Sequence, residues 1–128
     1  MLKKIKIILF IILVSMFLFS CKREPDILFC EGLTTDGKGT NCGTVFTTGD
    51  LTAVIKRARG FGSSSVTVNV YEKRNHLKQR MDSVNVEVRN TDTQTNTNLS
   101  FYNAGVFEVE VTVNDTVFAR HNITIQDE

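Results

Sequence analysis

Apolar and polar residues alternate along most of the chain after residue 50. An alternation with a period of two indicates a strand that has one face on a core and the other in water. Four stretches show this pattern clearly, at 51–55, 66–70, 84–88 and 107–113. Asn114 and Asp115 predict a turn, after which residues 117–125 continue as a final strand. Shorter strands are expected at 44–46 and 99–101.

These stretches amount to about seven short strands, and no helical periodicity competes with them after residue 26. The pattern predicts an all-β fold, an antiparallel sandwich of two sheets that occupies residues 27–128 as one domain. Residues 31–43 contain four glycines and are expected to form a loop. The polar run at 91–98 predicts either a loop or a strand at a wet sheet edge.

The first 20 residues have a different character. Lys3, Lys4 and Lys6 precede an apolar stretch over residues 7–19 that only Ser15 interrupts. A basic start followed by a short apolar stretch is typical of a secretory signal peptide. The stretch is short of the roughly 20 apolar residues that cross a bilayer. An uncleaved N-terminal anchor is the alternative interpretation.

The sequence Leu18-Phe19-Ser20-Cys21 resembles the lipobox of bacterial lipoproteins. The resemblance implies that residues 1–20 are removed and that a lipid on Cys21 attaches the protein to a membrane. Residues 21–26 would then be the lipidated cysteine and a charged tether, similar to the surface-export signals of Bacteroidota lipoproteins. The expected location is the bacterial cell envelope, lipid-anchored at the outer membrane on its periplasmic or surface-exposed face.

A second resemblance lies near the C-terminus. The sequence from Phe101 to Val113, FYNAGVFEVEVTV, resembles the last hairpin of immunoglobulin-like and polycystic-kidney-disease-type extracellular domains. In those families an aromatic residue and a glycine turn precede a strand of alternating aromatic and valine residues. The resemblance implies an immunoglobulin-like sandwich. It implies no function, because sandwiches of this kind have many unrelated roles.

Charge and cysteine content narrow the function further. The chain has 15 basic and 14 acidic residues, and removal of residues 1–20 leaves 12 basic against 14 acidic. That balance argues against a nucleic-acid partner, because nucleic-acid-binding domains usually carry a basic excess. Cys30 and Cys42 are expected to form a disulfide in an exported chain. Two free thiols, or half of a metal site, are the alternatives, and no metal or cofactor is expected.

The residues that could support catalysis form no recognisable pattern. His76 falls in an expected hairpin connection, and His121 shares the apolar face of the last strand. Glu108 and Glu110 share the polar face of a strand, where we expect them to be solvated. A nucleophile needs a base within hydrogen-bond reach, and no motif here predicts one. The sequence therefore predicts a protein that is not an enzyme.

Basic residues are concentrated between positions 56 and 80. This candidate contact surface comprises Lys56, Arg57, Arg59, Lys73, Arg74, Lys78 and Arg80. If the connections that carry them lie at one end of the sandwich, they form a positive rim for an envelope protein or an anionic glycan. Solvated loop charges are the alternative. The expected function is a non-catalytic binding or accessory module, with a structural subunit of a surface assembly or an inhibitor of an envelope enzyme as alternatives.

Overall fold

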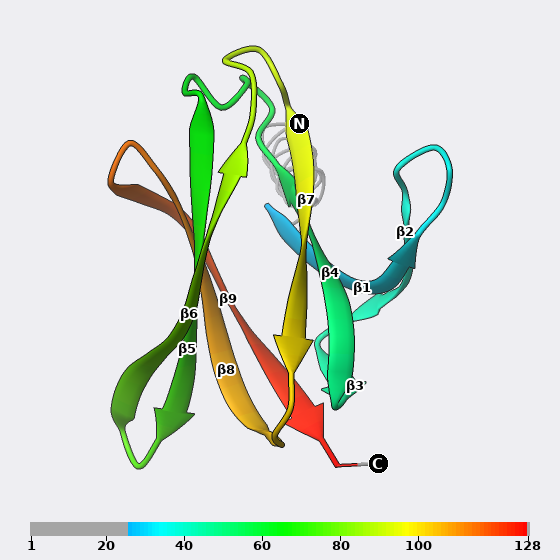
Figure 1. The fold of residues 1–128 in the computed structure, drawn as a ribbon, viewed down its shortest axis with the longest axis vertical. Helices are drawn as coiled ribbons and strands as arrows, with labels where there is room; N and C mark the ends of the chain where they lie inside the picture. Colours follow the sequence, from blue (N-terminus) through cyan, green and yellow to red (C-terminus); the bar gives the residue numbers. More distant parts are fainter. Residues whose placement is uncertain (1–25, 128) are drawn as a thin grey trace, which may run out of the picture.

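The computed structural model describes residues 26–127, and every regular element in that range is a β-strand (Figure 1). The predicted signal peptide, Cys21 and the tether up to residue 25 lie outside the described residues. The strands are β1 (Ile27–Leu33), β2 (Gly39–Gly43), β3 (Val45–Thr47), β4 (Gly49–Lys56), β5 (Ser65–Arg74), β6 (Leu77–Glu87), β7 (Gln94–Phe101), β8 (Gly105–Val113) and β9 (Thr116–Gln126). Within residues 26–127, no helix is long and apolar enough to cross a membrane.

The strands form two sheets that enclose one core. One sheet has the order β2-β1-β4-β7 and the other the order β3-β9-β8-β5-β6. Alternate residues of both sheets fill the space between them and are almost fully buried, among them Phe29, Ile55, Val68, Val109 and Ile123. The predicted all-β sandwich is confirmed, with nine strands rather than about seven.

The strand order also shows how the sandwich is connected. Strands β1-β4-β7 face β9-β8-β5, which corresponds to the A-B-E and G-F-C order of immunoglobulin-like sandwiches. The expectation of purely antiparallel pairing is wrong at one place, because β3 pairs parallel with β9 through Phe46 and Ile125. This short strand sits at the edge of the five-stranded sheet, where it follows β2 without a hairpin.

Two tight hairpins have the turn chemistry that their sequences predict. Asn75 and His76 join β5 to β6, while Asn114 and Asp115 join β8 to β9. All four residues have positive φ angles, between 48° and 66°. Two consecutive residues of this kind form the type I′ turn, whose twist matches that of the flanking strands. The predicted turn at 114–115 is confirmed.

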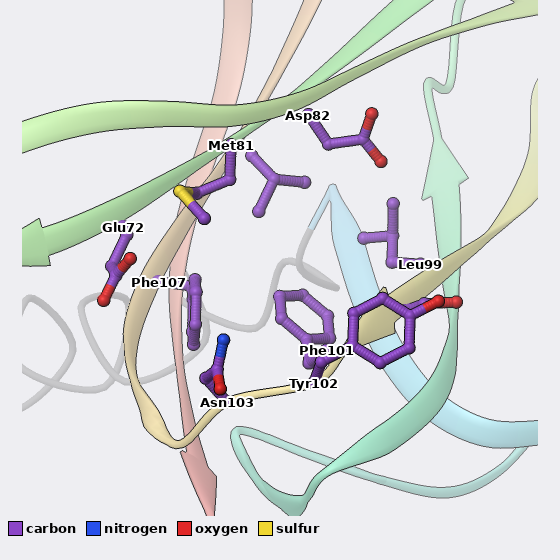
Figure 2. Close-up of a pocket in the computed structure, with 10 residues that line it drawn as sticks. Glu72, Met81, Asp82, Leu99, Phe101, Tyr102, Asn103 and Phe107 are labelled. Carbon is purple, nitrogen blue, oxygen red and sulfur yellow. The ribbon is translucent and has the colours of Figure 1, made fainter.

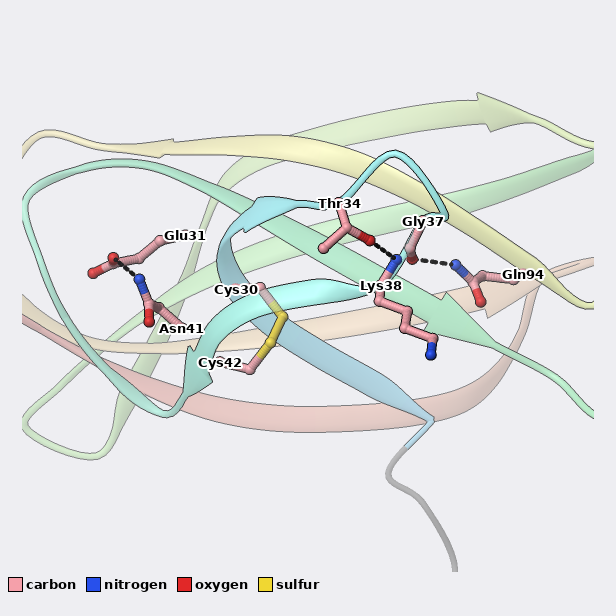
Figure 3. Close-up of a disulfide and its surroundings, with 8 residues drawn as sticks. All are labelled: Cys30, Glu31, Thr34, Gly37, Lys38, Asn41, Cys42 and Gln94. Carbon is pink, nitrogen blue, oxygen red and sulfur yellow. Dashed lines mark hydrogen bonds between the residues drawn. A yellow bond between two sulfur atoms is a disulfide. The ribbon is translucent and has the colours of Figure 1, made fainter.

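The expected loop at 31–43 is instead a hairpin of β1 and β2 that is closed by the predicted disulfide (Figure 3). Cys30 and Cys42 are direct cross-strand partners in this hairpin. Neither strand shows an alternation of apolar and polar residues in the sequence. The start of β1 is buried on both faces, and β2 is exposed along most of its length. Closing a 12-residue loop stabilises the fold by about 3 kcal/mol in the chain-entropy model.

Two β-bulges interrupt the five-stranded sheet, one in β6 and one in β9. Val70 pairs with Asp82 and Tyr71 pairs with Arg80, so Met81 is the extra residue in β6. Phe118 is the corresponding extra residue in β9. A bulge leaves its extra residue outside the ladder and can direct that side chain to a new place.

The sandwich has two ends with different connections. The tether end comprises Asp26, the 57–64 connection, the 88–93 connection and the 114–115 turn. Asp26 belongs to this end because the amide of Lys56, the last residue of β4, donates a hydrogen bond to the Asp26 carbonyl at 2.8 Å. The distal end comprises the 75–76 turn and the 102–104 connection. Strand β5 runs from the tether end to the distal end (Figure 1). At a rise of about 3.3 Å per residue, its ten residues span about 33 Å.

Candidate functional site

The seven cations of the predicted contact surface fall into two separate groups. Lys56, Arg57 and Arg59 lie at the tether end, at the close of β4 and in the connection that follows. The other four, Lys73, Arg74, Lys78 and Arg80, flank the 75–76 turn at the distal end. Because β5 separates the two groups along its whole length (Figure 1), they do not form one continuous rim.

At the tether end, Arg57 contacts its own chain. Its guanidinium donates a hydrogen bond to the carbonyl of Phe61 at 3.2 Å and lies 5.4 Å from the centroid of the Phe118 ring. Phe61 itself is only 1% exposed and closes this end of the core. Arg57 thus supports the fold, whereas Arg59 is exposed to solvent.

At the distal end, two glutamates accompany the cations. Glu108 and Glu110 are each only 7% exposed, so the expectation that they are solvated is wrong. The ammonium of Lys78 lies 3.3 Å from Glu108, and Arg120 lies 3.1 Å from Glu110. Lys73 is 3.5 Å from Glu108 as well. These long side chains lie over the carboxylates on the outer face of β8, and their charge is largely balanced there.

A more distinctive feature is a slot that opens between β6 and β7, toward the distal end (Figure 2). Its volume is about 170 Å³. The floor is apolar and comes from both sheets: Val70, Leu99, Phe101 and Phe107. The rings of Phe101 and Phe107 pack edge to face, with centroids 4.9 Å apart. The slot therefore gives access to the core at the open side of the sandwich.

Two large apolar side chains stand at the mouth of this slot. Met81 is 51% exposed and Tyr102 is 85% exposed. The bulge in β6 turns Met81 toward the slot, while Tyr102 lies just beyond the end of β7. Exposed apolar residues are ordinary when they are isolated, but a group around an apolar hollow indicates an interaction site.

Polar groups complete the rim of the slot. Glu72 and Asp82 lie on different sides of it, and the Asn103 amide adds a neutral donor and acceptor (Figure 2). Glu72 forms an ion pair with Arg74, yet the contacted oxygen accepts no hydrogen bond of good geometry. The Arg74 side chain of this pair is 74% exposed, whereas the Glu72 side chain is only 13% exposed.

The size of the slot limits what it can hold. Water occupies about 30 Å³ per molecule in the liquid, so 170 Å³ corresponds to five or six waters. Pockets for drug-sized ligands have volumes of roughly 300–1,000 Å³. The slot therefore suits one amino-acid side chain or a ligand of similar size.

The remaining sequence predictions concern cysteine and histidine. Cys30 and Cys42 form the predicted disulfide. His76 occupies the β5–β6 turn, and His121 is half-buried at the edge of the core, as predicted. Within residues 26–127, no three His, Cys, Asp or Glu side chains are grouped so that they could hold a metal ion.

Sequence reasoning missed the slot itself. Met81 stands outside the regular alternation of residues 84–88, and nothing in the sequence marks it as the extra residue of a bulge. Tyr102 belongs to the stretch that resembles the last immunoglobulin-like hairpin, and that resemblance implies a turn rather than a binding site. The sequence matches no protein family profile and no curated protein closely enough to show a relative, so the site must be judged from its own geometry.

Proposed function

We propose that this protein is a lipid-anchored, non-catalytic binding module of the bacterial cell envelope and that it contacts its partner through the slot. One observation carries the proposal: Met81 and Tyr102 are exposed at the mouth of a hollow whose floor belongs to the core. Aromatic residues and methionine are enriched where proteins bind one another.

The position of the tether supports this proposal. Five peptide units separate Cys21 from Asp26, which is a reach of at most about 18 Å. A lipid on Cys21 would therefore keep the tether end close to the membrane. The slot lies toward the other end of strands about 33 Å long, so it would face away from the membrane and remain accessible to a partner.

The proposal has two parts that can be tested separately in the protein's own cells. For the anchor, Cys21→Ala should move the protein from the membrane fraction to the soluble fraction. If this variant stays in the membrane fraction and is cleaved at the same place, the lipoprotein assignment is wrong.

For the binding site, Met81→Ser combined with Tyr102→Ser should reduce the recovery of a cross-linked partner at least tenfold. Leu77→Ser is the control, because Leu77 is 75% exposed but lies at the start of β6, next to the turn and outside the slot. An equal loss with the control, or no loss with the double variant, would refute the assignment of the slot.

One alternative also has structural support. Strands β6 and β7 are edge strands, and no described strand pairs with the outer edge of either. Open edges can template the addition of a further strand, as in surface assemblies built from repeated subunits. A structural subunit would therefore self-associate in detergent extracts, whereas a binding module would migrate as a monomer in the absence of its partner.

A further inference from the structure

We infer that the slot receives one basic side chain, a lysine or an arginine, from an extended segment of a partner protein. This inference deepens the proposed function and rests on it. It is carried by three features of the slot: an apolar channel of limited volume, a lining whose charged residues are both carboxylates, and an open strand edge beside the mouth.

The apolar channel suits the stem of a basic side chain. Lysine and arginine have aliphatic stems that pack along apolar surface while their charged heads reach polar groups. The aromatic rings of Phe101, Phe107 and Tyr102 provide such a surface (Figure 2). A volume of about 170 Å³ is enough for one stem of this kind.

The charges at the rim favour a cationic guest over an apolar or acidic one. Glu72 and Asp82 are the only charged residues among the ten that line the slot. Asp82 accepts a hydrogen bond from the Ser83 amide through one oxygen, at 2.8 Å. Glu72 is paired only with the exposed Arg74, in an ion pair without hydrogen-bond geometry. An incoming cation can replace Arg74 there, because the Arg74 side chain is 74% exposed and lies outside the lining, whereas the Glu72 side chain is only 13% exposed and needs a cation as its partner.

The strand edges explain why the guest would belong to an extended segment. The bulge at Met81 interrupts the β6 ladder, and bulges make an edge a poor template for pairing. Strand β7 pairs with β4 in regular register over its eight residues, and its other edge has no described partner. Strand β7 corresponds to strand E of an immunoglobulin-like sandwich, so a strand added to its free edge would take the place of strand D. Side chains along such a strand alternate in direction, so one of them could enter the slot.

The test uses the full chain in detergent and fluorescently labelled seven-residue peptides of high β-propensity. Only the central residue varies, among lysine, arginine, leucine and glutamate. We expect the lysine and arginine peptides to bind at least tenfold more tightly than the leucine and glutamate peptides, as measured by fluorescence anisotropy. Substitution of Glu72→Gln with Asp82→Asn should abolish the difference between lysine and leucine.

Glu87→Gln combined with Asp127→Asn is the matched control, because it also removes two negative charges, both from exposed positions outside the slot. The inference is wrong if the leucine peptide binds as tightly as the lysine peptide, or if none of the peptides binds above background. If the slot nevertheless cross-links to a partner in cells, the proposed function stands and only the basic guest is refuted. The comparison of peptides on the unaltered protein does not depend on how well any variant folds.

Discussion

The guanidinium carbon of Arg57 lies 5.4 Å from the centroid of the Phe118 ring. This contact joins the β4–β5 connection to the bulge in β9, two segments about 60 residues apart in the chain. The same guanidinium donates a hydrogen bond to the carbonyl of Phe61. Arg57 therefore holds the tether end of the sandwich closed over Phe61, and its charge is used within the molecule.

We expect Arg57→Ala to lower the free energy of unfolding by about 1–2 kcal/mol, since it removes both a cation–π contact and a charged hydrogen bond. The measurement is urea denaturation of the soluble domain from residue 22 onward. Arg59→Ala removes the same charge from an exposed neighbour and should change stability by less than about 0.5 kcal/mol. Equal effects of the two substitutions would contradict the role given to Arg57.

Gly39 is packed against the disulfide. A Cβ at this position would overlap the Sγ atoms of both Cys30 and Cys42. We expect Gly39→Ala to destabilise the domain by about 1–3 kcal/mol, the usual cost of overpacking, and to slow formation of the disulfide during refolding. Urea denaturation and alkylation of free thiols measure these two effects.

Gly43→Ala is the control for this substitution. Gly43 lies next to Cys42 on the same strand, but a Cβ there would have no neighbour within 4 Å. It should leave both stability and disulfide formation unchanged. If Gly39→Ala behaves in the same way, the disulfide does not pack against Gly39 as described.

Glu108 lies among three cations, namely Lys73, Lys78 and Arg120, at 3.3–3.6 Å. We expect Glu108→Gln to reduce the free energy of unfolding by about 1 kcal/mol. The effect is modest because the cations are 37–56% exposed and therefore screened by water. The loss should shrink in 1 M NaCl, where charges are screened over about 3 Å.

Glu87→Gln is the control for Glu108→Gln, because Glu87 is exposed on β6. It should have almost no effect on stability at either salt concentration. A loss at Glu108 that does not depend on salt would show that packing, rather than charge, explains its burial.

The sequence predicted those parts of the fold that have one buried and one wet face. The alternation at Val66, Val68 and Val70 identified β5, because their side chains enter the core while Thr67 and Asn69 do not. Strand β1 was not predicted, because Ile27, Phe29 and Cys30 are all buried and the sequence therefore shows no regular alternation of apolar and polar residues there. Turn chemistry was decisive at Asn114 and Asp115, where both residues adopt positive φ.

The candidate site could not be predicted in the same way, because it depends on which strands end up side by side. Charge clustering pointed to Arg57 and Lys78, yet one of them packs on Phe118 and the other covers Glu108. The slot forms where two edge strands from different sheets face each other, and a bulge places Met81 at its mouth. Neither the pairing of strands nor the bulge leaves a local mark in the sequence.

The most direct test of the central claim is site-specific photo-cross-linking in the protein's own cells. A photoreactive residue replaces Tyr102 at the slot in one strain and Thr116 in the other. Thr116 is also exposed, but it lies by the 114–115 turn at the tether end. The account predicts a discrete cross-linked product from position 102 and none from position 116. A product from position 116 alone, equal products from both, or none from position 102 would contradict it.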